Sequence, residues 1–104
     1  MKNSEFIKQV EAGKPVVKAE WRSGEAKSFT GVDNGRAYTS LSYVHNIEMD
    51  GRAMTLRQKL EGVNPAIYQP GVKKGDIVAI TLDIAEAAKG GFWVRAASVE
   101  KIEA

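Results

Sequence analysis

Aromatic and basic side chains of the kind that bind single-stranded nucleic acid recur along the chain. Such binding needs aromatic faces on which bases stack and cations that face the phosphates. Arg36 and Tyr38 share the polar side of one expected strand, Trp93 and Arg95 share one side of another, and Tyr68 lies in an irregular connection. The candidate nucleic-acid-binding residues are Arg36, Tyr38, Arg52, Arg57, Lys59, Tyr68, Lys73, Lys74, Trp93 and Arg95.

Positive charge is concentrated between residues 52 and 74, where lysines and arginines stand against a single acid, Glu61. A locally basic segment on a chain of net charge +2 is consistent with a surface that faces an anion. Solvated lysines and arginines give the same pattern without any function. Dedicated nucleic-acid-binding domains usually carry a stronger basic bias, so the charge alone does not decide between these readings.

The sequence offers little for catalysis or metal binding. His45 is the sole histidine, and it lies between Tyr43 and Ile47 on the apolar side of its expected strand. We therefore expect a hydrogen-bonded residue of the core or barrel rim rather than a catalytic base. The chain has no cysteine, and it contains neither a phosphate-binding loop nor a dinucleotide fingerprint. We expect a non-enzyme without cofactor or metal.

A short helix is expected over residues 4–12, before the first strand. Ser4 can cap it, Glu5 lies in the favoured first turn, and Gly13 can adopt the left-handed conformation that ends it. Phe6, together with Ile7 and Val10, is expected to form the face that docks on the rest of the protein.

Period-two alternation predicts strands between residues 15 and 102. The segment 15–31 has Trp21 on its inward side and is interrupted at Ser23-Gly24, so it is either one bent strand or a hairpin. Asn34-Gly35 and Asp50-Gly51 predict tight turns. One of Phe92 and Trp93 is expected in the core. The inward sides of two further strands are expected to comprise Ala37, Thr39, Leu41, Tyr43, His45, Ile47 and Met49, and Val78, Ile80, Leu82 and Ile84.

The order of these elements predicts one mainly β domain over residues 1–104, with the short helix at 4–12 and a barrel at 15–102. If 15–31 is one bent strand, a three-stranded meander, an irregular connection over 61–75 and a final hairpin give a five-stranded OB-like barrel. If Ser23-Gly24 is a true turn, a six-stranded SH3-like barrel or a sandwich competes.

Three segments resemble OB domains. Val72-Lys-Lys-Gly-Asp-Ile-Val-Ala-Ile80 is similar to the start of their fourth strand, and Gly91-Phe-Trp-Val-Arg-Ala-Ala-Ser-Val-Glu-Lys-Ile102 to their last strand. Asn64-Pro-Ala-Ile-Tyr-Gln-Pro-Gly71 resembles the Pro-Ala-Tyr-x-Pro-Gly passage of small phage single-stranded-DNA-binding proteins. The likeness is confined to the C-terminal part, and the N-terminal helix and two tryptophans depart from those proteins. The resemblance implies an OB-type fold and binding of single-stranded DNA.

These observations lead to three functional hypotheses. The first is binding of single-stranded DNA or RNA with low sequence specificity. The second is a protein-interaction or assembly module, with a homo-oligomer as one form of it, and the third is a small-molecule or carbohydrate binder that uses the barrel mouth. Because the chain has no long apolar segment and its N-terminus does not resemble a signal peptide, we expect a cytoplasmic protein without membrane contact.

Overall fold

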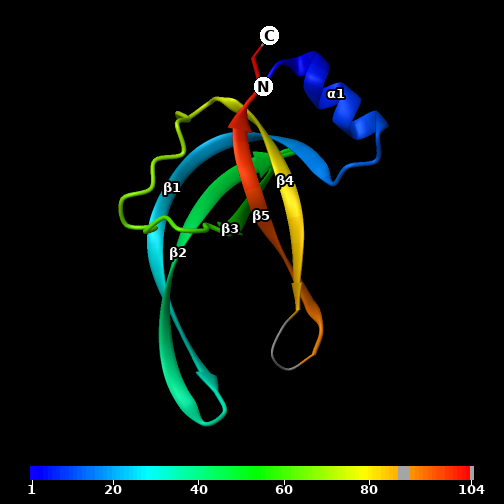
Figure 1. Ribbon diagram of the computed structural model, residues 1–104. Helices are drawn as coiled ribbons and strands as arrows, with labels where there is room; N and C mark the ends of the chain where they lie inside the picture. Colours follow the sequence, from blue (N-terminus) through cyan, green and yellow to red (C-terminus); the bar gives the residue numbers. More distant parts are fainter. Residues whose placement is uncertain (87–89, 104) are drawn as a thin grey trace.

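The computed structural model describes residues 1–86 and 90–103, which form one helix followed by five strands (Figure 1). The elements are α1 (Asn3–Glu11), β1 (Val16–Asp33), β2 (Arg36–Met49), β3 (Arg52–Gln58), β4 (Ile77–Glu86) and β5 (Phe92–Lys101). The segment between β3 and β4 contains no strand, as its prolines and glycines predict.

The strands close into a barrel in the order β1-β2-β3-β5-β4, and β4 pairs back onto β1. All neighbours are antiparallel except β3 and β5, which are parallel and joined by the pair Gln58 and Ala96. The predicted five-stranded barrel with a short N-terminal helix is thus confirmed, and its strand order fits the OB type. The six-stranded alternative is wrong because β1 runs unbroken through Ser23-Gly24.

Strand β1 serves two neighbours and bends between them. Its first part pairs with β4 over Val16–Glu20, and from Glu20 onward it pairs with β2. A β-bulge lies between Trp21 and Ser23, just before the predicted break at Ser23-Gly24. The extra residue, Arg22, increases the local twist and turns the strand from one side of the barrel to the other.

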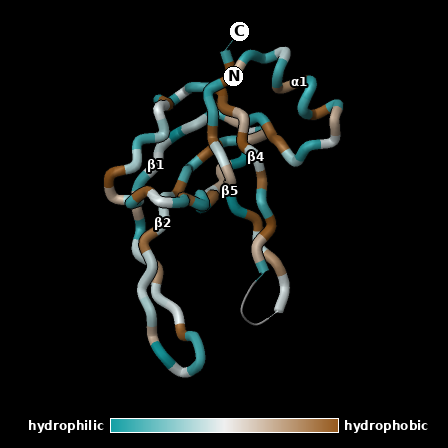
Figure 2. Tube along the Cα trace, viewed as in Figure 1, coloured by the Kyte–Doolittle hydropathy of each residue, from teal (hydrophilic) through white to brown (hydrophobic). Residues whose placement is uncertain are grey.

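Two hairpins project from the barrel as arms (Figure 1). We call them the β1–β2 arm (residues 27–42) and the β4–β5 arm (residues 83–86 and 90–95). The first ends in the predicted tight turn, where Asn34 and Gly35 have φ of 50° and 77°. Asp50 and Gly51 likewise have positive φ at the predicted turn between β2 and β3. Most of the β1–β2 arm has pale or hydrophilic colours in Figure 2.

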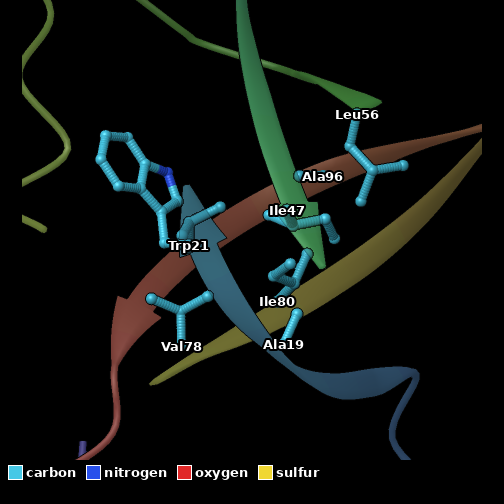
Figure 3. Close-up of a cluster of buried hydrophobic side chains, with 8 residues drawn as sticks. Ala19, Trp21, Ile47, Leu56, Val78, Ile80 and Ala96 are labelled. Carbon is cyan, nitrogen blue, oxygen red and sulfur yellow. The ribbon is translucent and has the colours of Figure 1, made fainter. Parts of the chain in front are cut away.

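The core lies inside the barrel and confirms the prediction for Trp21 (Figure 3). Its buried residues are Ala19, Trp21, Ile47, Leu56, Val78, Ile80, Ala96 and Val99.

The arms explain where the predicted core is wrong. On β2 the inward side is buried from Tyr43 to Ile47 and partly buried at Met49, but Ala37, Thr39 and Leu41 are exposed because they lie on the β1–β2 arm. Ile84 is 68% exposed for the same reason on the other arm. Neither Phe92, at 76%, nor Trp93, at 37%, belongs to the core. Alternation predicted which residues share a side, but an arm has no second sheet to cover that side.

Helix α1 packs on the outside of the barrel through Phe6, which contacts a small cluster with Val16 and Ala79. Ile7 and Val10 are exposed, so the expected three-residue docking face reduces to one side chain. The N-cap is Lys2, without a side-chain hydrogen bond, rather than Ser4, and Gly13 has the expected positive φ. No helix among residues 1–86 and 90–103 is long and apolar enough to span a membrane.

Gly24 provides the first test of this architecture. A Cβ atom there would lie 2.6 Å from Tyr43 Oη and 2.9 Å from Trp21 Cζ2, and both rings are buried. We expect Gly24→Ala to lower the free energy of unfolding by about 1–3 kcal/mol in chemical denaturation, because neither ring can move freely. In a Tyr43→Leu background the same substitution should cost less, since one of the two obstacles is gone. Equal costs in both backgrounds would contradict the close contact.

Candidate nucleic-acid interface

A cleft of about 200 Å³ opens between the bases of the two arms. Its lining comes from β2, β3, β5 and the connection after β3. The lining residues are Leu41, Ser42, Arg57, Gln58, Lys59, Leu60, Pro65, Trp93 and Arg95. Four of the predicted binding residues, Arg57, Lys59, Trp93 and Arg95, therefore meet at one site.

Arg57 is the central side chain of this site. Its guanidinium carbon lies 3.4 Å from the centroid of the Phe29 ring and 5.6 Å from that of Trp93. The guanidinium of Arg95 lies 5.6 Å from the same Trp93 ring. These are cation–π distances, so two arginines and two aromatic rings from three strands form one cluster.

Strand pairing brings the cluster together. On the outer side of the β1–β2–β3 sheet, Arg57 is the pairing partner of Val44, and Phe29 is the partner of Ser40. The pairing of Gln58 with Ala96 sets β5 beside β3, and Trp93 and Arg95 share one side of β5. Val44 is only 1% exposed although it belongs to neither hydrophobic core cluster. We attribute its burial to cover by the arginine and aromatic side chains on the outer side of the sheet.

Acidic neighbours offset part of the positive charge at the cleft. Arg95 Nε donates to Asp83 Oδ2 at 2.8 Å, and Lys59 Nζ lies 3.3 Å from Glu61 Oε1. The hydrogen bond from Arg95 lowers the pKa of Asp83, so this carboxyl group stays ionised beside the guanidinium. Arg57 pairs with no carboxylate among residues 1–86 and 90–103. It is therefore the cation of the cleft most available to a phosphate.

Tyr38 and Arg36 lie apart from the cleft, near the tip of the β1–β2 arm. Both border a second, more open hollow beside the Asn34 turn. A Cβ atom on Gly31, the pairing partner of Tyr38, would lie 2.6 Å from the Tyr38 hydroxyl oxygen and 2.7 Å from Cζ. The tyrosine ring thus rests directly on the glycine backbone. Tyr38 is nevertheless 52% exposed, so much of its surface is open to a ligand.

The other predicted binding residues do not line the cleft. Tyr68 is half-buried and packs edge-on against Tyr43, with ring centroids 4.9 Å apart. Arg52 begins β3 at the turn after β2, at the end of that strand away from the cleft. Lys73 and Lys74 are exposed in the turn that precedes β4. The basic segment 52–74 is therefore not one continuous surface patch.

Phe29 and Gln58 were not among the sequence candidates, although Phe29 joins the aromatic cluster and Gln58 lines the cleft. The side of β1 on which Phe29 lies depends on the bulge after Trp21, because one extra residue reverses the alternation. A bulge assigned to Arg22 would have placed Phe29 on the outer side. No local signal singles out Gln58.

His45 is fully buried behind the cleft, and it confirms the expectation of a hydrogen-bonded core residue. The Trp21 indole nitrogen donates to His45 Nδ1 at 2.9 Å, and His45 Nε2 lies 2.6 Å from Gln58 Oε1. Burial lowers the pKa of His45, and the hydrogen bond to Gln58 opposes part of that effect. A chain of three polar side chains thus leads from the barrel interior to the cleft.

No group of three or more His, Asp or Glu side chains within residues 1–86 and 90–103 could hold a metal ion. No protein family, curated protein or solved structure matches the chain. The site's geometry is therefore the basis for a functional assignment.

His45 should make stability depend on pH. In the unfolded chain it binds a proton near its ordinary pKa of 6.5, whereas in the folded protein its pKa is lower. The unfolded state therefore binds more protons below about pH 6.5, and the free energy of unfolding should fall as the pH drops from 7.5 to 5, by up to about 2 kcal/mol. Urea denaturation at several pH values measures this. In His45→Gln the decrease should be smaller, and parallel curves would contradict the assignment.

Proposed function

We propose that this protein binds single-stranded nucleic acid non-catalytically, in the cleft between the two arms. The observation that carries the proposal is the position of Arg57, which lies within cation–π distance of both Phe29 and Trp93 and lacks a carboxylate partner among the described residues. Aromatic faces beside an unpaired guanidinium supply the two interactions that unpaired strands need, base stacking and phosphate pairing. In OB folds, the face of strands 2 and 3 and the loops that flank it form the usual oligonucleotide-binding region.

Each side chain of the cleft has a part in this proposal. Trp93, which is partly exposed, stacks a base, and Arg57 pairs with the adjacent phosphate while Phe29 holds its guanidinium in place. Arg95 is oriented by Asp83 and makes a cation–π contact with the Trp93 ring. A duplex keeps its base faces stacked inside the helix, so this arrangement favours unpaired strands.

The tip of the β1–β2 arm extends the proposed path. Tyr38, supported from below by Gly31, offers a second stacking surface, and Arg36 beside it offers a cation. A nucleic-acid strand that runs from the cleft along this arm would contact first Trp93 and Arg57 and then Tyr38 and Arg36. The resemblance of residues 64–71 to a passage of small phage single-stranded-DNA-binding proteins supports the same proposal. Stacking without base-edge contacts explains low sequence specificity.

Fluorescence anisotropy with labelled oligothymidylate and a matched duplex tests this function. We expect the single strand to bind more tightly, and Trp93→Ala to weaken its binding roughly fivefold to hundredfold, since one stacked base contributes about 1–3 kcal/mol. Phe92→Ala is the matched control, because Phe92 is an exposed aromatic on the opposite side of the same strand. Equal affinity for duplex and single strand, or wild-type affinity in Trp93→Ala, would contradict the proposed cleft.

An arginine pair separates phosphate contact from general charge in the same assay. Arg57→Ala should weaken binding. It should also lower the slope of log Kd against log salt concentration by about one, the change expected when one phosphate contact is lost. Arg52→Ala removes the same charge at the far end of β3 and should leave that dependence close to wild type. If both variants behave alike, net charge rather than the cleft governs binding.

Self-association is a second candidate function, and one observation favours it. Ile84, Phe92 and Val94 form an exposed apolar side of the β4–β5 arm, opposite to Trp93. Burying such a surface against a second copy would be favourable. Sedimentation velocity over a wide range of protein concentration tests this: a dimer that Phe92→Ser disrupts would support an assembly module, and a monomer throughout would dismiss it.

A further inference from the structure

The chain of hydrogen bonds behind the cleft has a fixed direction. An indole nitrogen can only donate, so the Trp21 contact requires His45 Nδ1 to accept. In a neutral imidazole the other nitrogen then carries the hydrogen, so Nε2 donates to Gln58 Oε1. The polarity of all three groups therefore follows from the indole at the inner end.

This direction determines which end of the Gln58 amide remains without a hydrogen-bond partner among the described residues. Oε1 is engaged by His45, so the NH2 group at Nε2 is the free end of the side chain. It makes no hydrogen bond within residues 1–86 and 90–103. Gln58 is only partly buried, and it lines the cleft beside Arg57 and Trp93. A side-chain amide that is held at its oxygen and open at its nitrogen is an oriented donor.

We propose that Gln58 donates a hydrogen bond to an acceptor oxygen of the bound strand, and that Trp21 and His45 act as positioning residues that fix this orientation. The proposal rests on the function proposed above and names a ligand contact within it. Two acceptors have the required chemistry: the carbonyl oxygen of a base stacked on Trp93, and a phosphate oxygen held by Arg57.

The surroundings of His45 support a fixed orientation. Tyr43 packs edge-on against the imidazole with ring centroids 5.0 Å apart. The other polar neighbours are Trp21 on β1 and Gln58 on β3, neither of which ionises near neutral pH. Glu25 and Tyr68 act on Tyr43 rather than on the histidine. No carboxylate within residues 1–86 and 90–103 pairs with His45 to stabilise an imidazolium, so the buried ring stays neutral and keeps Nε2 as the donor.

Two variants of Gln58 and two ligands test the contact. Gln58→Glu keeps an acceptor for His45 but loses the NH2 donor, and Gln58→Met loses both without adding charge. Each is titrated with oligothymidylate and with an oligonucleotide of difluorotoluene, a thymine isostere without carbonyl oxygens. If a base carbonyl is the acceptor, wild type should prefer thymine roughly threefold to tenfold more than either variant does. If a phosphate oxygen is the acceptor, each variant should lose affinity by the same factor for both ligands, because the two oligonucleotides have the same phosphates.

The positioning role is tested by nitrogen NMR and by Trp21→Phe. His45 should show the neutral tautomer protonated at Nε2. A proton at Nδ1 would overturn the proposed direction of the hydrogen bonds from Trp21 through His45 to Gln58. Trp21→Phe removes the inner donor and leaves Gln58 in place. It should reduce the contribution of the amide, so that Gln58→Met costs less affinity in the Trp21→Phe background than in the wild-type background. An equal cost in both backgrounds would show that the indole does not orient Gln58.

The outcomes separate this inference from the proposed function. If wild type does not bind oligothymidylate, the proposed function fails, whatever the tautomer of His45. If wild type binds but folded Gln58→Met binds both ligands with unchanged affinity, only the Gln58 contact is overturned. Thermal melts of each variant establish that the protein is folded at the titration temperature.

Discussion

Strand β1 must pair with β4 along its first part and with β2 along the rest, and this double pairing is the constraint on which the barrel depends. The bulge at Arg22 provides the bend, and the absence of a side chain on Gly24 lets the rings of Tyr43 and Trp21 approach the backbone just beyond it. A straight strand could pair with one neighbour only. The barrel would then stay open, and β3 and β5 would not meet at Gln58 and Ala96.

The same bulge links the core to the candidate site. Trp21 precedes it and points into the barrel, where its indole reaches His45, whereas Phe29 follows it and lies on the outer side under Arg57. One inserted residue therefore assigns two aromatic side chains of a single strand to opposite tasks. The interior of the barrel and the cleft are thus coupled through the geometry of β1 as well as through the hydrogen bonds that end at Gln58.

The sequence predicted what local patterns encode: the strands, the Asn34-Gly35 and Asp50-Gly51 turns, and the place of Trp21 in the core. It could not predict that Leu41, Ile84 and Phe92 are exposed, because they alternate like core residues and only the lack of an opposing sheet leaves them uncovered. The candidate site was predicted in part. Arg57, Lys59, Trp93 and Arg95 meet, whereas Arg52, Lys73 and Lys74 lie elsewhere, since closeness in sequence does not place residues on one surface.

The distribution of charge around the cleft limits how the proposed binding can work. Arg95 and Lys59 already have acidic partners, and these partners reduce the field that a phosphate would experience. The Lys59–Glu61 pair is exposed and contributes little to stability, and the half-buried Arg95–Asp83 pair holds its guanidinium in place, so the two pairs mainly orient the cations and moderate the charge. Of the three cations that line the cleft, Arg57 alone lacks a carboxylate partner within residues 1–86 and 90–103, so long-range attraction of the cleft for a phosphate is weak. Affinity in such a cleft then rests on stacking and on directed hydrogen bonds, for which the rings of Phe29 and Trp93 and the oriented amide of Gln58 are suited.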